Sequence, residues 1–290
     1  MKKRQTSLPA QLPFALSMVI FGTIGLLRRQ IGLDSGLIAC ARGLLGCALL
    51  LVLQRLLGRK PNWRALRPKL GALVLSGVLM GLNWMLLFEA YRYTSIAVAT
   101  LCYYMAPVIL LAVSPFVFGE TLGGRQIFCM LLAVAGMVLI SGLGGAPSGS
   151  WPGIALGLGA AVLYAFINVI NRKALRELDA YDKTFVQLGA AGLIMLPYLA
   201  LTGGFSGLCV TPRDAGLLLL AGVVHTALPY ALYFGSMVRL PTRSVALLSY
   251  LDPLTALLLS ALVLREPLSV AGIVGAGCIL GATVVSEVSG

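Results

Sequence analysis

Asp252 is the only acidic or basic residue in a long apolar stretch near the C-terminal end, and a proline follows it directly. The stretch runs from Val245 to Leu264, close to the ~20 residues that a helix needs to cross the ~30 Å hydrocarbon core of a bilayer. A charge at that depth costs about 2.5–3.5 kcal/mol on insertion scales, so such groups are few and face protein or water. Pro253 would also leave the carbonyl group of Ser249 without its helical amide partner. We therefore expect an acid, a free carbonyl group and a helix break at mid-membrane.

Asp252 shares a helix face with two hydroxyl side chains. Ser249, Asp252 and Thr255 are spaced by three residues, which places them side by side on a helix. This face could accept a proton or bind the ammonium group of a substrate. The structural alternative is a protonated acid that donates a hydrogen bond to the carbonyl group freed by Pro253. We favour the functional role, because acids inside a membrane usually serve function.

Arg42 and His225 are two further titratable residues inside apolar segments. The Arg42 side chain could snorkel to the lipid headgroups, pair structurally with Asp252, or bind a substrate carboxylate. We expect Arg42 either to snorkel or to form a structural pair. His225, the only histidine, could titrate near neutral pH. A neutral ring bonded to a neighbouring carbonyl group is the commoner arrangement, and we expect it here.

Polar and aromatic side chains in the apolar segments could complete a binding site. Tyr164, Asn168 and Asn171 form a stripe on one helix face, which should contact protein or a cavity rather than lipid. Aromatic walls with a few polar groups suit small organic ligands, although some of these rings will be core packing. The candidates for such a wall are Asn83, Trp84, Tyr103, Tyr104, Tyr230, Tyr233 and Tyr250.

The composition predicts an all-α integral membrane protein. Hydrophobic residues make up 59% of the chain, charged residues 11%, and the mean hydropathy is +0.93. Soluble domains carry about 25% charged residues. Ten apolar segments should cross the bilayer as helices. They are 10–27, 36–54, 70–89, 96–118, 126–143, 152–170, 184–202, 215–236, 244–264 and 269–286.

The distribution of charge argues against nucleic acid as the partner, despite a net charge of +12. If the N-terminus is cytoplasmic, most of the 22 lysine and arginine residues fall in cytoplasmic loops. We therefore expect both termini in the cytoplasm and the lipid bilayer as partner. The six cysteines form no CxxC pair. No metal, cofactor or disulfide is expected.

The chain repeats itself at an interval of 146 residues. At this interval Pro107 aligns with Pro253 and Glu120 aligns with Glu266, without a gap. Both prolines are candidate helix breaks. The glutamates lie at segment ends, where a loop-capping or gate role competes evenly with mere exposure. Other aligned pairs are Tyr104 with Tyr250, Ser114 with Ser260 and, where the interval slips to 143, Arg29 with Arg172.

The repeat predicts two halves, residues 1–145 and 146–290, with five helices each. Because five is odd, the second half would enter the membrane the opposite way up. Inverted repeats are typical of secondary transporters, which bind substrate near the midplane between the halves. The sequence has no GxxxxGK[ST] loop for ATP-driven transport and no HExxH motif. We expect a non-enzyme, with a channel or a structural membrane protein as the alternative.

The chain contains the motifs FEAYRYTS (88–95), MAPV (105–108), GETL (119–122), LDPL (251–254) and REPL (265–268). With these motifs, each half resembles an EamA domain of the drug/metabolite transporter superfamily. Arg42 is similar to an arginine of that family, whereas Asp252 and Tyr164 stand where the family often has glutamate and tryptophan. The resemblance implies ten helices, inverted halves, a central cavity and a bacterial-type inner membrane.

The substrate can be narrowed by the charges inside the segments. A phosphate or nucleotide-sugar exchanger should have several intramembrane cations, and only Arg42 qualifies. Asp252 together with Arg42 suits an amino acid, or a related zwitterion or amine. We expect an exporter of such small metabolites, either proton-coupled or facilitative. The alternative within the superfamily is an organic-anion or phosphate exchanger.

Overall fold

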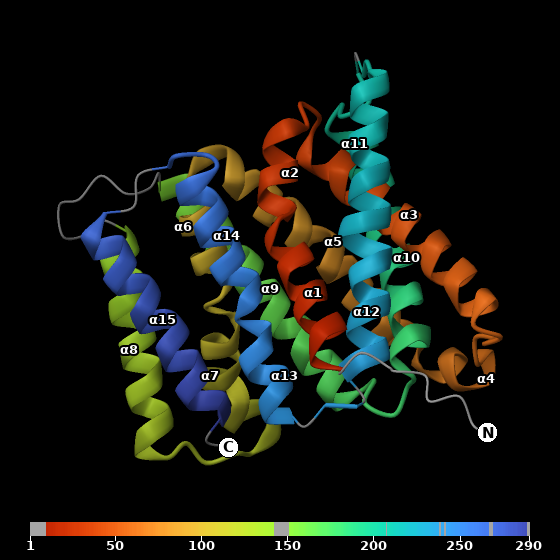
Figure 1. Ribbon diagram of the computed structural model, residues 1–290. Coiled ribbons are helices and arrows are strands. Elements are labelled where there is room, and N and C mark those ends of the chain that lie inside the picture. Colours follow the sequence, from red (N-terminus) through yellow and green to blue (C-terminus); the bar gives the residue numbers. More distant parts are fainter. Residues whose placement is uncertain are drawn as a thin grey trace, which may run out of the picture.

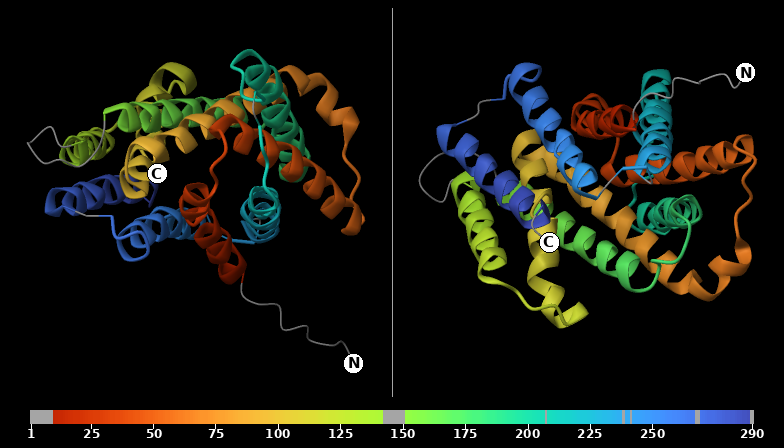
Figure 2. Two further views of the ribbon diagram at one scale, coloured as in Figure 1. Left: turned by 90° about the horizontal axis from the view of Figure 1, so that it is seen from above. Right: turned by 60° about the horizontal axis from the view of Figure 1, so that its bottom comes forward.

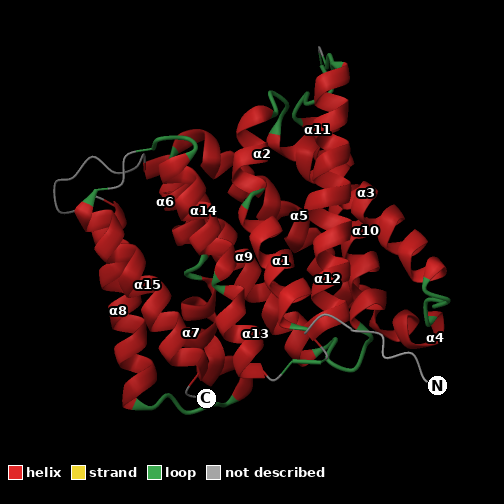
Figure 3. Cartoon of the chain, viewed as in Figure 1, coloured by secondary structure: helices red, strands yellow, loops and turns green. Residues whose placement is uncertain are grey.

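The computed structural model describes residues 10–141, 151–206, 208–237, 239–240, 242–266 and 269–288. This part of the chain consists of helices and their connections and contains no strand (Figure 3). The predicted all-α class is therefore confirmed. The linker-like stretch 142–150, which includes the predicted boundary at 145/146, lies outside the described residues.

Among the described residues, seven helical stretches are long and apolar enough to cross a membrane, and three shorter helices are also apolar. Each of the ten predicted segments contains helix in the part of the chain that the structure describes. The chain is therefore a multi-pass integral membrane protein. The seven long stretches are Gln11–Gln30, Ser35–Leu56, Trp63–Tyr93, Ile96–Phe118, Trp151–Lys173, Ala180–Leu201 and Pro212–Met237; the shorter ones are Gly124–Leu139, Leu251–Leu262 and Val270–Ala282.

Helices of the first half are bounded by conventional capping signals. Asp34 precedes α3 and its carboxylate accepts a hydrogen bond from the Gly36 amide at 2.8 Å, which satisfies a free donor of the first turn. Asn62 caps α4 in the same way. The helices are α1 (Gln11–Gly22), α2 (Ile24–Gln30), α3 (Ser35–Leu56), α4 (Trp63–Leu66), α5 (Leu70–Tyr93), α6 (Ile96–Tyr103), α7 (Ala106–Phe118) and α8 (Gly124–Ser141), with a 3-10 turn at Arg67–Lys69.

Helices of the second half follow the same scheme. Asp179 caps α10 by accepting from the Tyr181 amide at 3.0 Å, and Thr211 forms a capping box with Asp214 at the start of α11. The helices are α9 (Trp151–Lys173), α10 (Ala180–Leu201), α11 (Pro212–Gly222), α12 (Leu228–Met237), α13 (Thr242–Ser249), α14 (Leu251–Leu262) and α15 (Val270–Val288), with a π-helical turn at Val223–Ala227 between α11 and α12.

Both predicted helix breaks are present, at equivalent positions of the two halves. The first lies at Tyr104, between α6 and α7, and the second at Tyr250, between α13 and α14. Pro107 and Pro253 lie in the first turns of α7 and α14. Proline costs little there, because a first-turn amide has no partner within its helix. Each proline therefore begins a new helix instead of interrupting one, which differs from the expectation for Pro253.

The helices of the two halves interleave. α3 packs against α10, α8 against α15, and α5 against α9 and α10. The pair α8 and α15 forms one end of the molecule and α3 with α4 forms the other (Figures 1 and 2). Gly43 makes the α3–α10 contact possible, since a Cβ atom there would lie 2.5 Å from the Gly192 amide nitrogen. Small residues permit such close contact between membrane helices.

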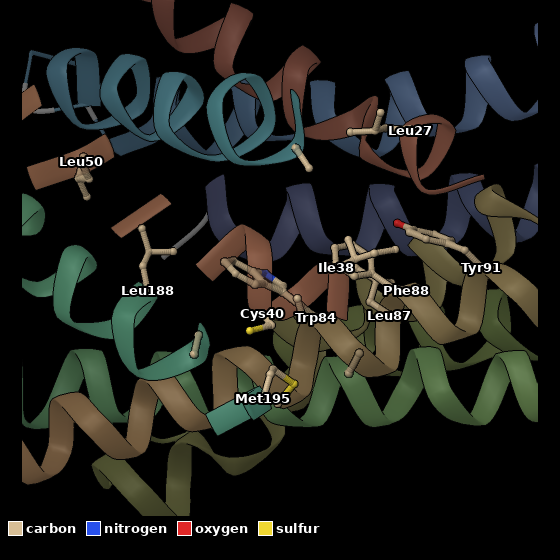
Figure 4. Close-up of a cluster of buried hydrophobic side chains, with 14 of the residues drawn as sticks. Leu27, Ile38, Cys40, Leu50, Trp84, Leu87, Phe88, Tyr91, Leu188 and Met195 are labelled. Atoms are coloured by element: carbon tan, nitrogen blue, oxygen red, sulfur yellow. The ribbon is translucent and has the colours of Figure 1, made fainter. Parts of the chain in front are cut away.

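The main hydrophobic core lies where α3, α5 and α10 meet. Figure 4 shows Trp84, Leu87 and Phe88 of α5 among side chains of α3 and α10. Phe88 is fully buried, as are the core residues Ile38 and Leu188. Because dense packing fixes side-chain positions, this core holds the inner faces of α3 and α5 in place for the site described next.

Candidate functional site

Asp252 lies at the contact between the two halves. Its Oδ2 atom accepts a hydrogen bond from the hydroxyl group of Tyr104 at 2.9 Å. Tyr104 belongs to the helix break of the first half, and Asp252 follows the equivalent break of the second half. The carboxyl group also sits in the first turn of α14, where the helix dipole favours a negative charge. The two breaks thus meet at the predicted acid.

α1 fixes the position of Asp252 through a glycine. A Cβ atom on Gly22 would lie 2.4 Å from the carbonyl oxygen of Asp252 and 2.7 Å from the Cβ atom of Thr255. The end of α1 therefore rests directly on the backbone of α14. A side chain at Gly22 would push the two helices apart and move the acid.

The hydroxyl groups beside Asp252 are bonded within their own helices. Ser249 donates to the Val245 carbonyl oxygen at 2.8 Å, and Thr255 donates to that of Leu251 at 2.6 Å. Their oxygen atoms keep acceptor capacity, because a hydroxyl group has two lone pairs. The break at Tyr250 separates Ser249, at the end of α13, from Asp252 and Thr255 of α14, so the prediction that all three share one helix face was wrong for Ser249. Asp252 is the member of this group whose side chain bonds to the other half in the described structure.

Arg42 is buried and bonded inside the protein, so the expected snorkelling was wrong. Its Nε donates to the Thr226 hydroxyl at 2.9 Å and its Nη2 to the carbonyl oxygen of His225 at 3.0 Å. Its guanidinium carbon lies 4.3 Å from the centre of the Trp84 ring, a cation–π contact. Among the described residues Arg42 forms no salt bridge, although Asp252 lies within electrostatic range.

The partners of Arg42 come from the π-helical turn Val223–Ala227. Such turns are rare and occur frequently at functional sites. His225 lies in this turn, with Nε2 2.9 Å from the Thr23 hydroxyl and Nδ1 3.4 Å from the Leu220 carbonyl oxygen. The expected contact with a neighbouring carbonyl group is therefore present. Thr23 and Thr226 were not foreseen; the only sequence signal was a hydroxyl residue directly after the single histidine.

A group of tyrosine rings lies beside Asp252. The Tyr103 ring centre is 6.1 Å from that of Tyr104 and 5.2 Å from that of Tyr164. Tyr230 packs on Phe21 and Phe234, with centres 5.4 and 5.7 Å apart. Tyr103, Tyr104, Tyr230 and Asp252 itself are all partly exposed. The acid therefore lies beside aromatic rings that are themselves partly exposed.

Other predicted site residues are engaged in helix packing. Asn83 of α5 is buried and donates to the Ala160 carbonyl oxygen of α9 at 2.6 Å. Asn168 donates to the Tyr164 carbonyl oxygen within α9 at 2.8 Å. Asn171 accepts from Gln187 of α10 at 2.9 Å. The structure thus places the asparagines in helix contacts, and Trp84 under Arg42. Tyr250 is buried at its helix break, and Tyr233 packs between Phe14 and Phe234.

Comparison with known proteins identifies the family. The model of the EamA-like transporter family matches residues 9–142 and again residues 151–287. The chain belongs to the EamA-like transporter family. The double match confirms the internal repeat, because both halves fit the same domain. It also confirms the predicted membership of the drug/metabolite transporter superfamily and makes the chain a membrane transporter.

Similar proteins come from several bacteria. An uncharacterized transporter of Bacillus subtilis, YxxF, is 29% identical, with 86% of this chain and 80% of that one covered. Protein PecM of Dickeya dadantii is 30% identical over 70% of this chain and 68% of its own, and protein RarD of Salmonella typhi is 27% identical over 71% and 70%. A crystal structure with 19% identity superposes with a TM-score of 0.64 over 96% of both chains. This last likeness shows that the fold is shared.

Proposed function

We propose that this EamA-family transporter is a secondary exporter of small zwitterions such as amino acids, or of related amines. The observation that carries the proposal is that Arg42 of the first half and Asp252 of the second half lie near a shared, partly exposed region. Asp252 accepts a hydrogen bond from a neutral hydroxyl group, and Arg42 is bonded only to neutral oxygens in the described structure. A substrate ammonium group would bind Asp252, and its carboxylate would bind Arg42.

The proposed topology has ten crossings in two inverted halves. It is supported by the double family match, by a helix in each of the ten apolar segments, and by the clustering of basic residues in alternate loops. With both termini in the cytoplasm of a bacterial inner membrane, the halves would divide at 145/146. The Asp252 region would then lie near the midplane and open to each side in turn.

Proton coupling is a further part of the proposal. Asp252 could bind a proton on one side of the membrane and release it on the other, or it could hold the substrate amine in a facilitative cycle. Burial in protein disfavours the charged form of a carboxyl group, whereas the Tyr104 hydrogen bond and the helix dipole favour it. This balance suits a group that changes its protonation during transport.

A channel, a structural membrane protein or an organic-anion exchanger would be the alternatives. A second buried arginine, Arg28, is relevant to the last of these. Its guanidinium group is bonded to the carbonyl oxygen of Ile31 at 2.8 Å and to Ser35 at 3.0 Å, and Ser35 donates to Glu89. Arg28 is thus held in a network that contains the carboxylate of Glu89, which disfavours an anion site built from two free cations.

Transport in proteoliposomes tests the proposal. The purified protein would be offered a radiolabelled amino-acid mixture, with and without a pH gradient, in competition with decarboxylated amines and with simple carboxylic acids. We expect saturable uptake, counterflow, and stronger competition by zwitterions than by either single-charge class. Non-saturable flux would indicate a channel, and competition by organic anions alone would overturn the zwitterion assignment.

A further inference from the structure

The segment after α14 is tied to the first half by Glu266. Its Oε1 accepts from Arg29 at 2.7 Å, and its Oε2 accepts from the Ile96 amide at 3.0 Å and from the Ser260 hydroxyl. The side chain of Glu266 is only 15% exposed. Arg29 also donates to the Thr94 carbonyl oxygen at 3.0 Å. We call Arg29, Ser260, Glu266 and the amide of Ile96 the Glu266 latch.

The repeat places a second cluster at the equivalent positions of the other half. Arg172 pairs with Glu120 and lies 4.2 Å from the centre of the Phe118 ring. The Glu120 and Arg172 side chains are 42% and 53% exposed. The buried hydroxyl group of Ser114 has no hydrogen-bond partner in the described structure, whereas Ser260, its equivalent, donates to Glu266. We call Ser114, Glu120 and Arg172 the Glu120 latch.

The helix contacts beside the two latches differ as well, and the closer packing lies beside the Glu266 latch. α14 packs against α6 next to the Glu266 latch. The equivalent helices, α7 and α13, form no comparable interface in the part of the chain that the structure describes. A cavity of about 160 Å³ lies next to the Glu120 latch and is lined by Ser114, Glu120, Arg172 and Pro107. Pro107 begins α7 just after Tyr104, so this cavity extends toward the helix break that contacts Asp252.

We propose that the two clusters are alternating latches, of which one is closed at a time. In this structure the Glu266 latch is closed and the Glu120 latch is open. In the opposite state Glu120 would fold back onto Ser114 and the first turn of α13, and Glu266 would release Ser260 and α6. The inference rests on the proposed alternating access. With the proposed topology, the structure is open toward the cytoplasm.

Electrostatics explains why a carboxylate suits this role. A carboxylate that is mostly shielded from water, as Glu266 is, needs hydrogen-bond donors around it, because an unpaired buried charge costs several kcal/mol. Glu266 obtains those bonds from an arginine, a serine and the N-terminus of α6, which favours negative charge. These donors surround the carboxylate only when α14 and α6 are together. When the helices separate, the glutamate becomes exposed and keeps only its arginine, which is the one partner of Glu120 among the described residues.

Spin-label distances measure the two sides independently of any substrate. One pair would replace Tyr93 and Leu262 beside the Glu266 latch; the other would replace the equivalent residues, Arg239 and Phe116. All four positions are exposed. The labels would be placed in the full chain with its native cysteines replaced, in lipid nanodiscs. We expect a short 93–262 distance and a longer 116–239 distance before any latch is altered.

Breaking the closed latch should move both distances in opposite directions. In Glu266→Gln the 93–262 distance should lengthen and the 116–239 distance should shorten in the same sample. Ser260→Ala, which removes one hydrogen bond, should give a smaller shift in the same directions. Glu89→Gln is the matched control, because Glu89 bonds to Arg92 and Ser35 and to no member of the Glu266 latch in the described structure, and it should change neither distance.

The remaining outcomes separate this inference from the proposed function. Glu120→Gln should leave the 116–239 distance long; a shift in the same direction as Glu266→Gln would contradict the latches. Unchanged distances in both Glu266→Gln and Ser260→Ala would overturn the latches, and transport by the unaltered protein would then leave the proposed function standing. If both distances lengthen together in Glu266→Gln, a pore opens, and alternating access fails together with the latches.

Discussion

The two halves share one fold, but each contributes a different charge to the site. Arg42 and Gln187 occupy the same position relative to the aspartate caps of α3 and α10, Asp34 and Asp179. Gln187 bonds to Ser76 and Asn171 and so joins helices, whereas Arg42 faces the π-helical turn and the Asp252 region. The repeat thus accounts for the scaffold, whereas the two charged residues of the candidate site depart from the repeat.

The helix breaks show the same division of roles. Asp252 of the second half aligns with Ala106 of the first, and both lie in the first turn of a helix that begins near a proline. Tyr104 of the first break contacts the acid of the second. One half therefore provides the anion and the other provides its hydrogen-bond donor and the cation. A ligand that bridges the charges would sense the movement of one half against the other.

Neutralising the anion should have the largest effect. Asp252→Asn keeps the size of the side chain but removes titration and charge. We expect the variant to insert normally and to lose gradient-driven accumulation by about tenfold or more, since a hydrogen bond to a charged group contributes ~1.5–3 kcal/mol. Accumulation by reconstituted protein is the measurement. Asp214→Asn, at an exposed helix cap, is the control.

Exchange without a gradient separates the two roles of Asp252. If the residue carries the coupling proton, exchange should survive in Asp252→Asn; if it binds the substrate amine, exchange should fail as well. Accumulation at the level of the unaltered protein would remove Asp252 from the mechanism. It would leave a protonated acid that only supports the helix break.

Replacing Arg42 by glutamine, the residue at the equivalent position of the second half, should have the next largest effect. Arg42→Gln removes the cation but keeps a polar side chain at the buried position. We expect the half-saturating concentration for a zwitterion to rise about tenfold, and inhibition by a decarboxylated amine to be unchanged, because an amine has no carboxylate to bind. Concentration-dependent uptake measures both. An equal loss for amines would assign Arg42 to structure alone.

Helix packing offers a third comparison between the halves. Gly22 aligns with Ala165, yet a Cβ atom on Gly22 would collide with Asp252 of α14. Gly22→Ala should therefore destabilise the protein by about 1–3 kcal/mol, the usual cost of overpacking, and lower its melting temperature in detergent. Ala165→Gly, the reverse change in the other half, should cost only about 0.5–1 kcal/mol. Similar decreases in melting temperature for Gly22→Ala and Ala165→Gly would refute a special α1–α14 contact.

The sequence was sufficient for the features that depend on local pattern. The breaks near Pro107 and Pro253 follow from the repeat and from proline chemistry, and the ten helical segments follow from hydropathy. The partners of Arg42 were not predictable, because Thr226 and the His225 carbonyl group become available only through a π-helical turn. The helix-packing roles of Asn83 and Asn171 depend likewise on which helices meet. The difference between Ser114 and Ser260 depends on which side chains lie beside each serine, which the repeat does not encode.

The smallest expected effect concerns the bond that joins the two breaks. Tyr104→Phe removes the hydroxyl group that donates to Asp252 at 2.9 Å and keeps the ring beside Tyr103. A typical hydrogen bond contributes ~0.5–1.5 kcal/mol, so we expect a two- to tenfold loss of uptake at low substrate concentration, at ~1.4 kcal/mol per tenfold.

Tyr103→Phe is the matched control, since its ring packs on Tyr164 and no bond from its hydroxyl group reaches Asp252 in the described structure. The difference in uptake between Tyr104→Phe and Tyr103→Phe should disappear in an Asp252→Asn background if Tyr104 and Asp252 act through their shared hydrogen bond. If Tyr104→Phe lowers uptake equally with and without the carboxylate, the tyrosine contributes as an aromatic wall, and the two breaks are joined by packing alone.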